Sequence, residues 1–386
     1  MEASSRKLRA RTSAASLVRT LDVSWREAGK ILLLTRVVFL VVAYAGAWFL
    51  ATSRGGLTVG FLDLWARWDA THFFAIAERG YAGAGPNDGA FFPGFPLLLR
   101  LVGVAGLPLA AAGLIVSAGA SLVAFAFLFR LAEHDAGAGA GRRAVLYLAL
   151  FPTAVFLVAP YSEALYLAGA IPAFFFARRR RWELVGPPAA LAVATRAVGL
   201  FLVLGLVVEY LSQHDFARAR VRAALGSLAL AVLPVIAYGA YLGATRGDVL
   251  FFLTAQRLGW YRDFTNPVSS FVSTWNTWSG VDYPSNWLFA WRAEIVAAAL
   301  GVGFVAWALR KRAWGYAAYM GAVMASLLTS TWYFSIPRML LSLFPAVVFL
   351  AAATRARPGW HDLVLVTLAP LATLGVVVFT SGAWFF

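Results

Sequence analysis

An acid and an imidazole lie three residues apart near the amino terminus, at Asp69 and His72. The stretch 61–79 contains no proline and ends just before Gly80, so it predicts a helix. At about 100° per residue, Asp69 and His72 fall on the apolar side of this helix. That side also carries Leu62, Trp65 and Ile76. The other side carries polar residues that we expect to be solvated: Asp63, Arg67, Thr71 and Glu78.

Asp69 is the candidate for chemistry. A carboxylate on an apolar surface costs on the order of several kcal/mol unless it is paired or hydrogen-bonded, so such acids are candidates for functional sites. One carboxylate can act as a general base that takes the proton of an attacking hydroxyl. In the alternative reading, Asp69 only caps the helix or pairs with His72, and His72 is structural.

Arginines in apolar surroundings could bind a negatively charged substrate group. Arg196 lies in an apolar stretch with no acid nearby in the sequence, so we expect it to bind phosphate or to pair with Glu163. Arg338 either binds phosphate too or extends to lipid headgroups. Glu163 either orients Arg196, binds a sugar hydroxyl or caps a helix. Arg257 and Arg262 are further candidates for phosphate binding.

The composition requires a membrane around these residues. Of 386 residues, 61% are hydrophobic and only 13% are charged, where soluble proteins have about 25%. This excludes a water-soluble enzyme and a disordered chain and predicts an all-α polytopic membrane protein. The net charge of +15 comes from short basic clusters between apolar runs, which is typical of cytoplasmic loops and not of nucleic-acid binding.

Cysteine is absent and the four histidines show no metal-ligand spacing, so we expect neither disulfides nor a bound metal.

The basic clusters also predict the topology. Residues 1–30 form a basic cytoplasmic segment, and residues 31–386 form one transmembrane domain with about eleven helices. Two long segments, 51–106 and 244–292, lie on the outer side, where the second caps the bundle. The separate spans are expected at about 31–50, 107–129, 223–243, 293–309, 314–331, 336–353 and 363–381.

Two intervals between basic clusters are harder to assign. Residues 143–178 are long enough for two short helices that turn at 159–162. Residues 183–211 form either a tight pair of helices that turns near Arg196 or a single crossing.

Three sequence blocks resemble the signature of GPI mannosyltransferase II, the PIG-V family. The first block is Trp68-Asp69-Ala70-x-His72-Phe73, followed by Gly80-Tyr81 and by Ala90-Phe91-Phe92-Pro93-Gly94-Phe95-Pro96. The second block is Pro152-Thr153-Ala154-Val155-Phe156 with Tyr161-Ser162-Glu163-Ala164-Leu165, and the third is Thr195-Arg196-Ala197-Val198-Gly199. The resemblance spans roughly 30–350, and the excess of arginine over lysine favours a bacterial homologue.

The resemblance implies a glycosyltransferase with the GT-C fold, whose active site faces away from the cytosol in a cell membrane. Such enzymes transfer mannose from polyprenyl-phosphate mannose, with inversion, to a lipid or glycolipid acceptor. The base is an acid of the first outer loop, which matches Asp69. Trp68, His72 and Tyr81 belong to the same block and are expected to bind substrate. The family carries an acid where this chain has Pro86, and Asp88 lies two residues later.

Other functions fit a helical membrane protein. The same helices could transfer a different polyprenyl-linked sugar, or the chain could be a lipid or sugar transporter. A transporter usually shows two related halves with ionisable residues at matched positions, and this sequence shows no such pairing. A non-catalytic partner of a true enzyme is the remaining alternative.

Overall fold

The described chain of this computed structural model is built from helices, with one isolated bridge between Phe264 and Ser330. It covers residues 2–52, 60–83, 85–214, 222–280 and 285–386. The first half contains α1 (Glu2–Thr52), η1 (Phe61–Leu64), α2 (Asp69–Gly83), η2 (Pro86–Ala90), α3 (Gly94–Gly103), α4 (Leu109–Ala136), α5 (Ala140–Ala149), η3 (Ala154–Leu157), α6 (Glu163–Arg178), η4 (Trp182–Leu184), α7 (Gly186–Thr195) and α8 (Gly199–Ser212). The second half contains α9 (Arg222–Arg246), α10 (Phe251–Trp260), α11 (Pro267–Gly280), α12 (Ser285–Arg310), α13 (Trp314–Leu328), α14 (Ile336–Met339), η6 (Leu340–Ser342), α15 (Pro345–Thr354) and α16 (Pro358–Thr380).

Five helices are long and apolar enough to cross a membrane, within α1, α4, α9, α12 and α16. A sixth crossing is possible if α14 and η6 are counted with α15, from which they are bent by 76°. The expectation of a multi-pass helical protein is thus met, whereas about eleven crossings are not confirmed. The shorter helices explain the difference. The longest of them, α6, has 16 residues and spans about 24 Å, less than the roughly 30 Å of a bilayer core.

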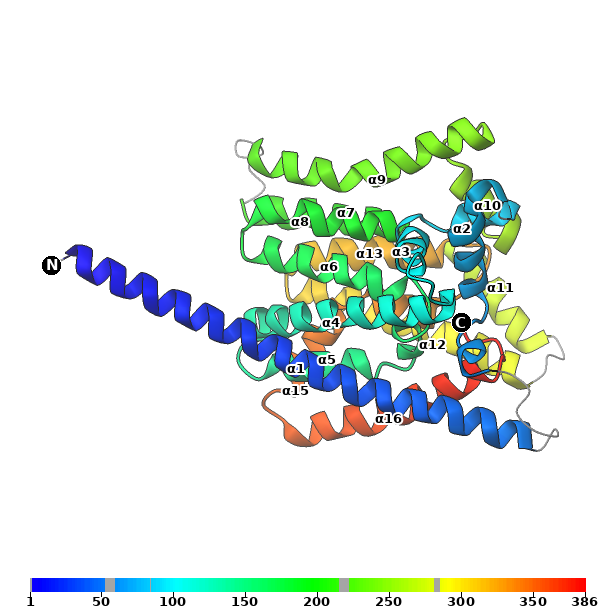
Figure 1. Ribbon diagram of the computed structural model, residues 1–386, viewed down its shortest axis with the longest axis horizontal. Coiled ribbons are helices and arrows are strands. Elements are labelled where there is room, and N and C mark those ends of the chain that lie inside the picture. The colour runs from blue at the N-terminus through cyan, green and yellow to red at the C-terminus, as the bar shows by residue number, and fades with distance from the viewer. Residues whose placement is uncertain (1, 53–59, 84, 215–221, 281–284) are drawn as a thin grey trace.

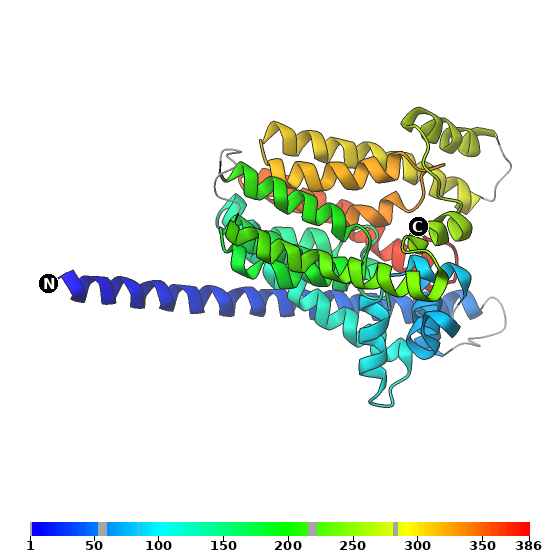
Figure 2. The same cartoon turned by 90° about the horizontal axis from the view of Figure 1, so that it is seen from above.

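The short helix α6 and the long helix α4 lie inside the bundle, whereas the long helices α1, α9 and α16 lie at its edges (Figures 1 and 2). In the spans of α1, α9, α12 and α16, only 22–28% of the residues are buried, against 61% in α4. The exposed side chains of α1 include Leu33, Leu34, Val37 and Val41, which are stable only against lipid. By contrast, α6 is buried over nearly its whole length, and its first residue is Glu163. A charged residue there needs a partner inside the protein.

The interval 183–211 forms two short helices, as the first of the two sequence-based layouts predicts. The break lies at Arg196, whose backbone is extended. The following helix turns back, because a Cβ at Gly199 would lie 2.5 Å from the Cα of Val193. The far ends of the pair meet again, since Trp182 Nε1, just before α7, donates to Gln213 Oε1 at the end of α8 over 3.2 Å. The turn therefore places Arg196 at one end of the bundle and the cluster 178–181 at the other.

The expected helix over 61–79 is wrong in its first half. Residues 61–64 form a separate short turn, and α2 begins only at Asp69. The interruption has three causes. Trp65 is fully buried and packs near Phe379, Trp68 adopts a left-handed φ of 52°, and the carbonyl of Arg67 accepts a hydrogen bond from the Tyr161 hydroxyl over 2.9 Å. The structure therefore lacks the two predicted helix faces. Leu62 and Trp65 do not share a helix face with Asp69, and Asp63 and Arg67 do not lie on the opposite face of the same helix.

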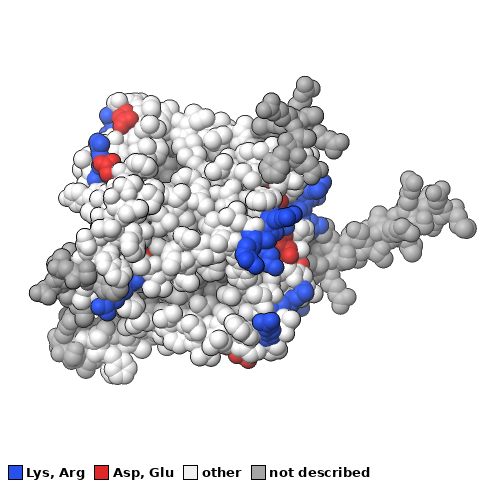
Figure 3. Space-filling view, turned by 180° about the vertical axis from the view of Figure 1, so that it is seen from behind, with Lys and Arg blue, Asp and Glu red and all other residues white. Residues whose placement is uncertain are grey.

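Basic residues gather at the end of the bundle opposite to α2, which we call the Arg178 end (Figure 3). Arg143 donates to the carbonyl of Thr354, and Arg355 donates to that of Ala136 over 2.6 Å. These contacts join two of the predicted cytoplasmic clusters, the one that contains Arg143 and the one that contains Arg355. On the face shown in Figure 3, the surface between the two ends carries almost no charge, as a surface in contact with lipid requires.

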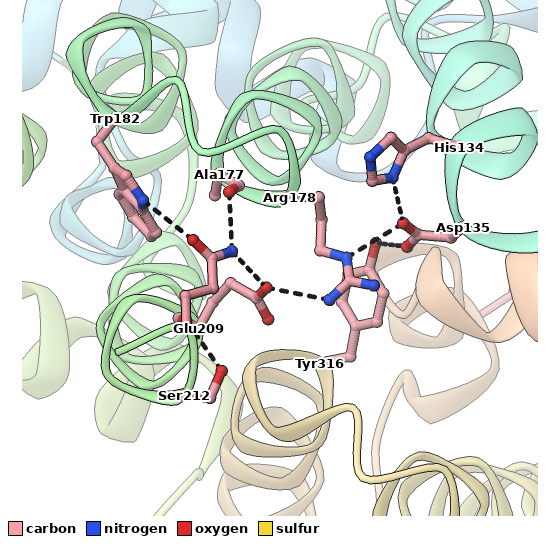
Figure 4. A network of polar contacts seen from close by, with 9 residues as sticks. His134, Asp135, Ala177, Arg178, Trp182, Glu209, Ser212 and Tyr316 are labelled. Carbon is pink, nitrogen blue, oxygen red and sulfur yellow. Dashed lines mark hydrogen bonds and ion pairs between the residues drawn. The ribbon is translucent and has the colours of Figure 1, made fainter. Parts of the chain in front are cut away.

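A polar network closes the Arg178 end (Figure 4). Arg178 Nε and Nη1 donate to Asp135 Oδ1 over 3.1 Å and to Glu209 Oε1 over 3.0 Å. The hydroxyl of Tyr316 donates to Asp135 Oδ2 over 2.7 Å. Because these residues lie on α4, α6, α8 and α13, one arginine connects four helices.

Replacing Arg178 with Gln should destabilise the protein by about 3 kcal/mol. The carboxylates of Asp135 and Glu209 are only 8% and 2% exposed and would lose their cation. The value is at the low end for a broken buried ion pair, because Arg178 is itself 31% exposed. The measurement is unfolding in detergent, with Arg180→Gln on the exposed neighbouring turn as control. Equal stability of the two variants would contradict this role of Arg178.

Candidate active site

Asp69 is the first residue of α2, at the end of the bundle opposite to Arg178. Its side chain is 23% exposed, and it lines a cavity of about 1630 Å³. The left-handed Trp68 turns the chain immediately before it, which costs strain that glycine would avoid. The loop therefore presents Asp69 at the start of a helix, beside the cavity.

Four charged side chains from distant parts of the sequence form one chain of ion pairs. Arg338 Nη1 donates to Asp69 Oδ2 over 2.6 Å, and Arg338 Nε donates to Glu163 Oε1 over 2.5 Å. Arg196 Nη1 donates to the same Glu163 oxygen and to Ser162 Oγ. Two carboxylates thus face two guanidiniums, so their formal charges cancel. We call Asp69, Glu163, Arg196 and Arg338 the ion-pair quartet.

Arg338 occupies the centre of this quartet. It is only 8% exposed, so it does not extend to lipid headgroups. Its guanidinium carbon lies 4.7 Å from the ring centroids of both Phe156 and Tyr161. Aromatic faces stabilise a desolvated cation and leave its edge free for hydrogen bonds. The second family block, which contains both aromatic residues, therefore positions Arg338.

Glu163 supports the two arginines and does not line the cavity. It is 2% exposed, and of the alternatives drawn from the sequence the structure shows the pairing with Arg196. Its second oxygen, Oε2, is buried and has no hydrogen-bond partner in the described structure. A buried acceptor without a partner costs about 1–3 kcal/mol.

The turn that carries Arg338 is fixed by a residue that the sequence analysis missed. Ser335 adopts a left-handed φ of 62° directly before α14. The backbone N–H groups of Ser335 and Ile336 donate to the two oxygens of Glu294, each over 2.7 Å. Glu294 lies on α12 and is fully buried. The sequence does contain a signal for Glu294. It is an acid in the apolar run 293–309, and such an acid needs a partner, as Asp69 does.

His72 lies one turn after Asp69 and lines the cavity too. Its Nδ1 is 2.5 Å from Asp88 Oδ1, and its ring stacks on Phe91 with 4.9 Å between centroids. The hydrogen bond that His72 donates to Asp88 raises the pKa of His72 above its ordinary value, and burial opposes this shift. Asp88 itself is 3% exposed and lies behind His72, outside the cavity lining.

The other residues predicted to bind substrate divide into two groups. Trp68 is 44% exposed and lines the cavity. Tyr81 lies outside that lining, and its hydroxyl donates to the carbonyl of Phe91 over 2.6 Å. Tyr81 therefore holds the segment that carries Phe91, which lines the cavity. Within the described residues, no group of three His, Asp or Glu side chains could hold a metal ion.

The cavity is larger than the roughly 300–1,000 Å³ of a typical small-molecule pocket. Its wall combines the arginines with aromatic rings from three parts of the chain, among them Phe91, Trp260, Phe334 and Trp384. The expected capping segment contributes directly, since α10 and the residues after it form one side. Such a space suits two substrates, one of them with a charged group.

Two comparisons with known proteins, one with family models and one with curated proteins, point to the same family. The family described as Mannosyltransferase (PIG-V) matches residues 56–343. GPI alpha-1,6-mannosyltransferase 2 of Mus musculus is 38% identical over 160 residues, which are 38% of this chain and 32% of that protein. The protein of the same name from Homo sapiens is 39% identical over 122 residues, or 28% and 24%. The match thus spans about a third or less of the length of these curated relatives.

Replacing Glu294 with Ala should lower both stability and any activity that needs Arg338. Each N–H group that loses its acceptor costs about 1–3 kcal/mol. Glu294→Gln keeps one oxygen acceptor and should lose less. Unfolding in detergent measures the effect, with Glu183→Ala at an exposed position as control. An alanine variant as stable as the wild type would contradict this role.

The contact between His72 and Asp88 should depend on pH. Because the folded pKa of His72 is raised, the contact contributes its full stability below about pH 6.5. The contribution is lost as the pH rises through the raised value. A double-mutant cycle of His72→Gln and Asp88→Asn should therefore show a larger coupling at pH 6 than at pH 9. A coupling that is constant over this range would exclude a charged His72.

Proposed function

Because the chain belongs to the PIG-V mannosyltransferase family, we propose that it is a membrane-embedded inverting mannosyltransferase with a GT-C-type helix bundle. The donor is polyprenyl-phosphate mannose, and the acceptor is a hydroxyl of a lipid-linked or glycolipid molecule. The observation that carries this proposal is the carboxylate of Asp69 on the cavity wall, with one oxygen on Arg338.

Asp69 acts as the general base in this proposal. Its Oδ2 is held by Arg338. Its other oxygen takes the proton of the acceptor hydroxyl while the hydroxyl oxygen attacks the anomeric carbon of mannose. The bond from this carbon to the phosphate oxygen breaks, and the polyprenyl phosphate leaves with the bonding electrons. A single displacement of this kind inverts the anomeric carbon.

The rest of the quartet orients the base. Glu163 holds Arg338 from the side opposite to Asp69, and Arg196 holds Glu163. The position of the base is thus fixed before substrate arrives, which favours reaction because little reorganisation is needed. The role of Arg196 in binding phosphate stays a prediction, since its Nη1 donates to Ser162 and Glu163.

The active site faces away from the cytosol in this proposal. Its support is the charge distribution, because the basic clusters 178–181 and 355–357 lie at the end opposite to Asp69. Basic residues are retained on the cytoplasmic side of membrane proteins. The lipid-linked donor and acceptor would then enter from the membrane or from the outer surface.

The test is mannose transfer by Asp69→Asn from polyprenyl-phosphate mannose. The amide cannot take a proton, so we expect a loss of about 10²–10⁴-fold in kcat. Glu78→Gln on the exposed side of the same helix should keep wild-type turnover and serves as control.

Three outcomes would overturn parts of the proposal. Wild-type kcat in a folded Asp69→Asn variant would remove Asp69 as the base. Transfer from another polyprenyl-linked sugar in preference to mannose would change the donor. Movement of lipid across vesicles without any transfer would identify a transporter.

A further inference from the structure

The phosphate of the sugar donor needs N–H groups that can donate hydrogen bonds to it. The ion-pair quartet has few such N–H groups to offer. Arg338 gives Nη1 to Asp69 and Nε to Glu163, and Arg196 gives Nη1 to Glu163 and Ser162. A phosphate that took these donors would have to displace carboxylates that are nearly buried. Breaking such pairs leaves uncompensated charge inside the protein.

Arg262 is a third guanidinium on the cavity wall, and its contacts differ. Its Nη2 donates to the backbone carbonyl of Phe334 over 2.8 Å, which is a neutral acceptor. Its Nε is buried and has no partner among the described residues. A buried donor without an acceptor costs free energy, so this side chain gains when an anion arrives.

The backbone around Arg262 is fixed relative to Arg338. Helix α10 ends at Trp260, and Tyr261 has a left-handed φ of 53°. The next residues then pair with the segment that leads to α14. The N–H of Asp263 donates to Thr331 Oγ1 over 3.0 Å, and Phe264 forms the bridge with Ser330. The guanidinium is therefore held against the same turn that carries Arg338.

The electrostatic surroundings agree with this placement. Burial lowers the pKa of Arg262 to about 10, so it stays charged at neutral pH. The charges of Arg338 and Arg196 lower it too, whereas those of Glu294 and Asp69 raise it. Arg338, Arg196 and Asp69 line the same cavity as Arg262. Both oxygens of Glu294 are occupied by backbone N–H groups. Glu294 therefore attracts Arg262 without using its hydrogen-bond donors.

We infer that Arg262 is the main protein contact of the phosphate on the lipid-linked sugar donor, an inference that rests on the proposed function. In the donor, the phosphate joins the polyprenyl chain to mannose and carries one negative charge. When the bond between mannose and phosphate breaks, its electrons stay on the phosphate oxygen, which gains a second charge. The guanidinium of Arg262 offers planar paired N–H groups to these oxygens.

The experiment measures binding of a short-chain polyprenyl phosphate to the full-length protein in detergent, with the matching polyprenol as uncharged probe. Arg262→Gln should weaken binding of the phosphate by about tenfold or more and leave the polyprenol unchanged. Arg262→Lys keeps the positive charge but lacks the planar paired N–H groups. Its affinity for the phosphate should lie between those of the wild type and of Arg262→Gln. Arg79→Gln removes the same charge from an exposed position of α2 outside the cavity lining and should change binding less than twofold.

Binding and turnover separate the two proposals. One outcome contradicts the role of Arg262: the wild type transfers mannose, and Arg262→Gln binds the phosphate as the wild type does. The unfolding temperature of Arg262→Gln must show that this variant is folded. If Arg262→Gln loses phosphate binding while the wild type transfers no mannose, the proposed function fails and the phosphate site stands. Loss of binding to phosphatidylinositol but not to polyprenyl phosphate would assign Arg262 to another lipid and overturn the inference.

Discussion

The ion pair between Asp69 and Arg338 is the constraint on which the rest of the structure depends. It joins residues 269 positions apart in the sequence, so most of the bundle must fold before it can form. Each partner follows a left-handed residue, Trp68 or Ser335, and each of those turns is held by a hydrogen bond or packing from another element. Such strained backbone persists only where the surroundings determine it.

A low-dielectric environment explains why the site is built from pairs. An isolated charge inside a membrane protein is expensive, so each guanidinium is matched by a carboxylate, an aromatic face or a backbone carbonyl. The same solution occurs at the opposite end, where Arg178 lies between Asp135 and Glu209. One end thus uses paired charges to join helices, and the other uses them to hold a reactive carboxylate beside a cavity.

Much of the site could be predicted from the sequence, because Asp69, Arg196 and Arg338 are charges in apolar surroundings. The two helices in 183–211 were one of the two layouts that the sequence left open. The sequence could not predict the break before Asp69, since the causes are the distant residues Tyr161 and Phe379. Glu294 was visible as an acid in the apolar run 293–309, but its role could not be predicted, because its partners are backbone N–H groups, which leave no trace in side-chain patterns.

The solitary oxygen of Glu163 has a consequence for how tolerant the protein can be of heat. In a packed protein interior nearly every acceptor has a hydrogen-bond partner, whereas Oε2 of Glu163 has none among the described residues. An unsatisfied buried acceptor costs about 1–3 kcal/mol, so it lowers the heat resistance of the folded protein. A neutral side chain at this position would remove that cost, but it would leave two buried guanidiniums without their shared anion, and breaking a buried ion pair in this way costs more.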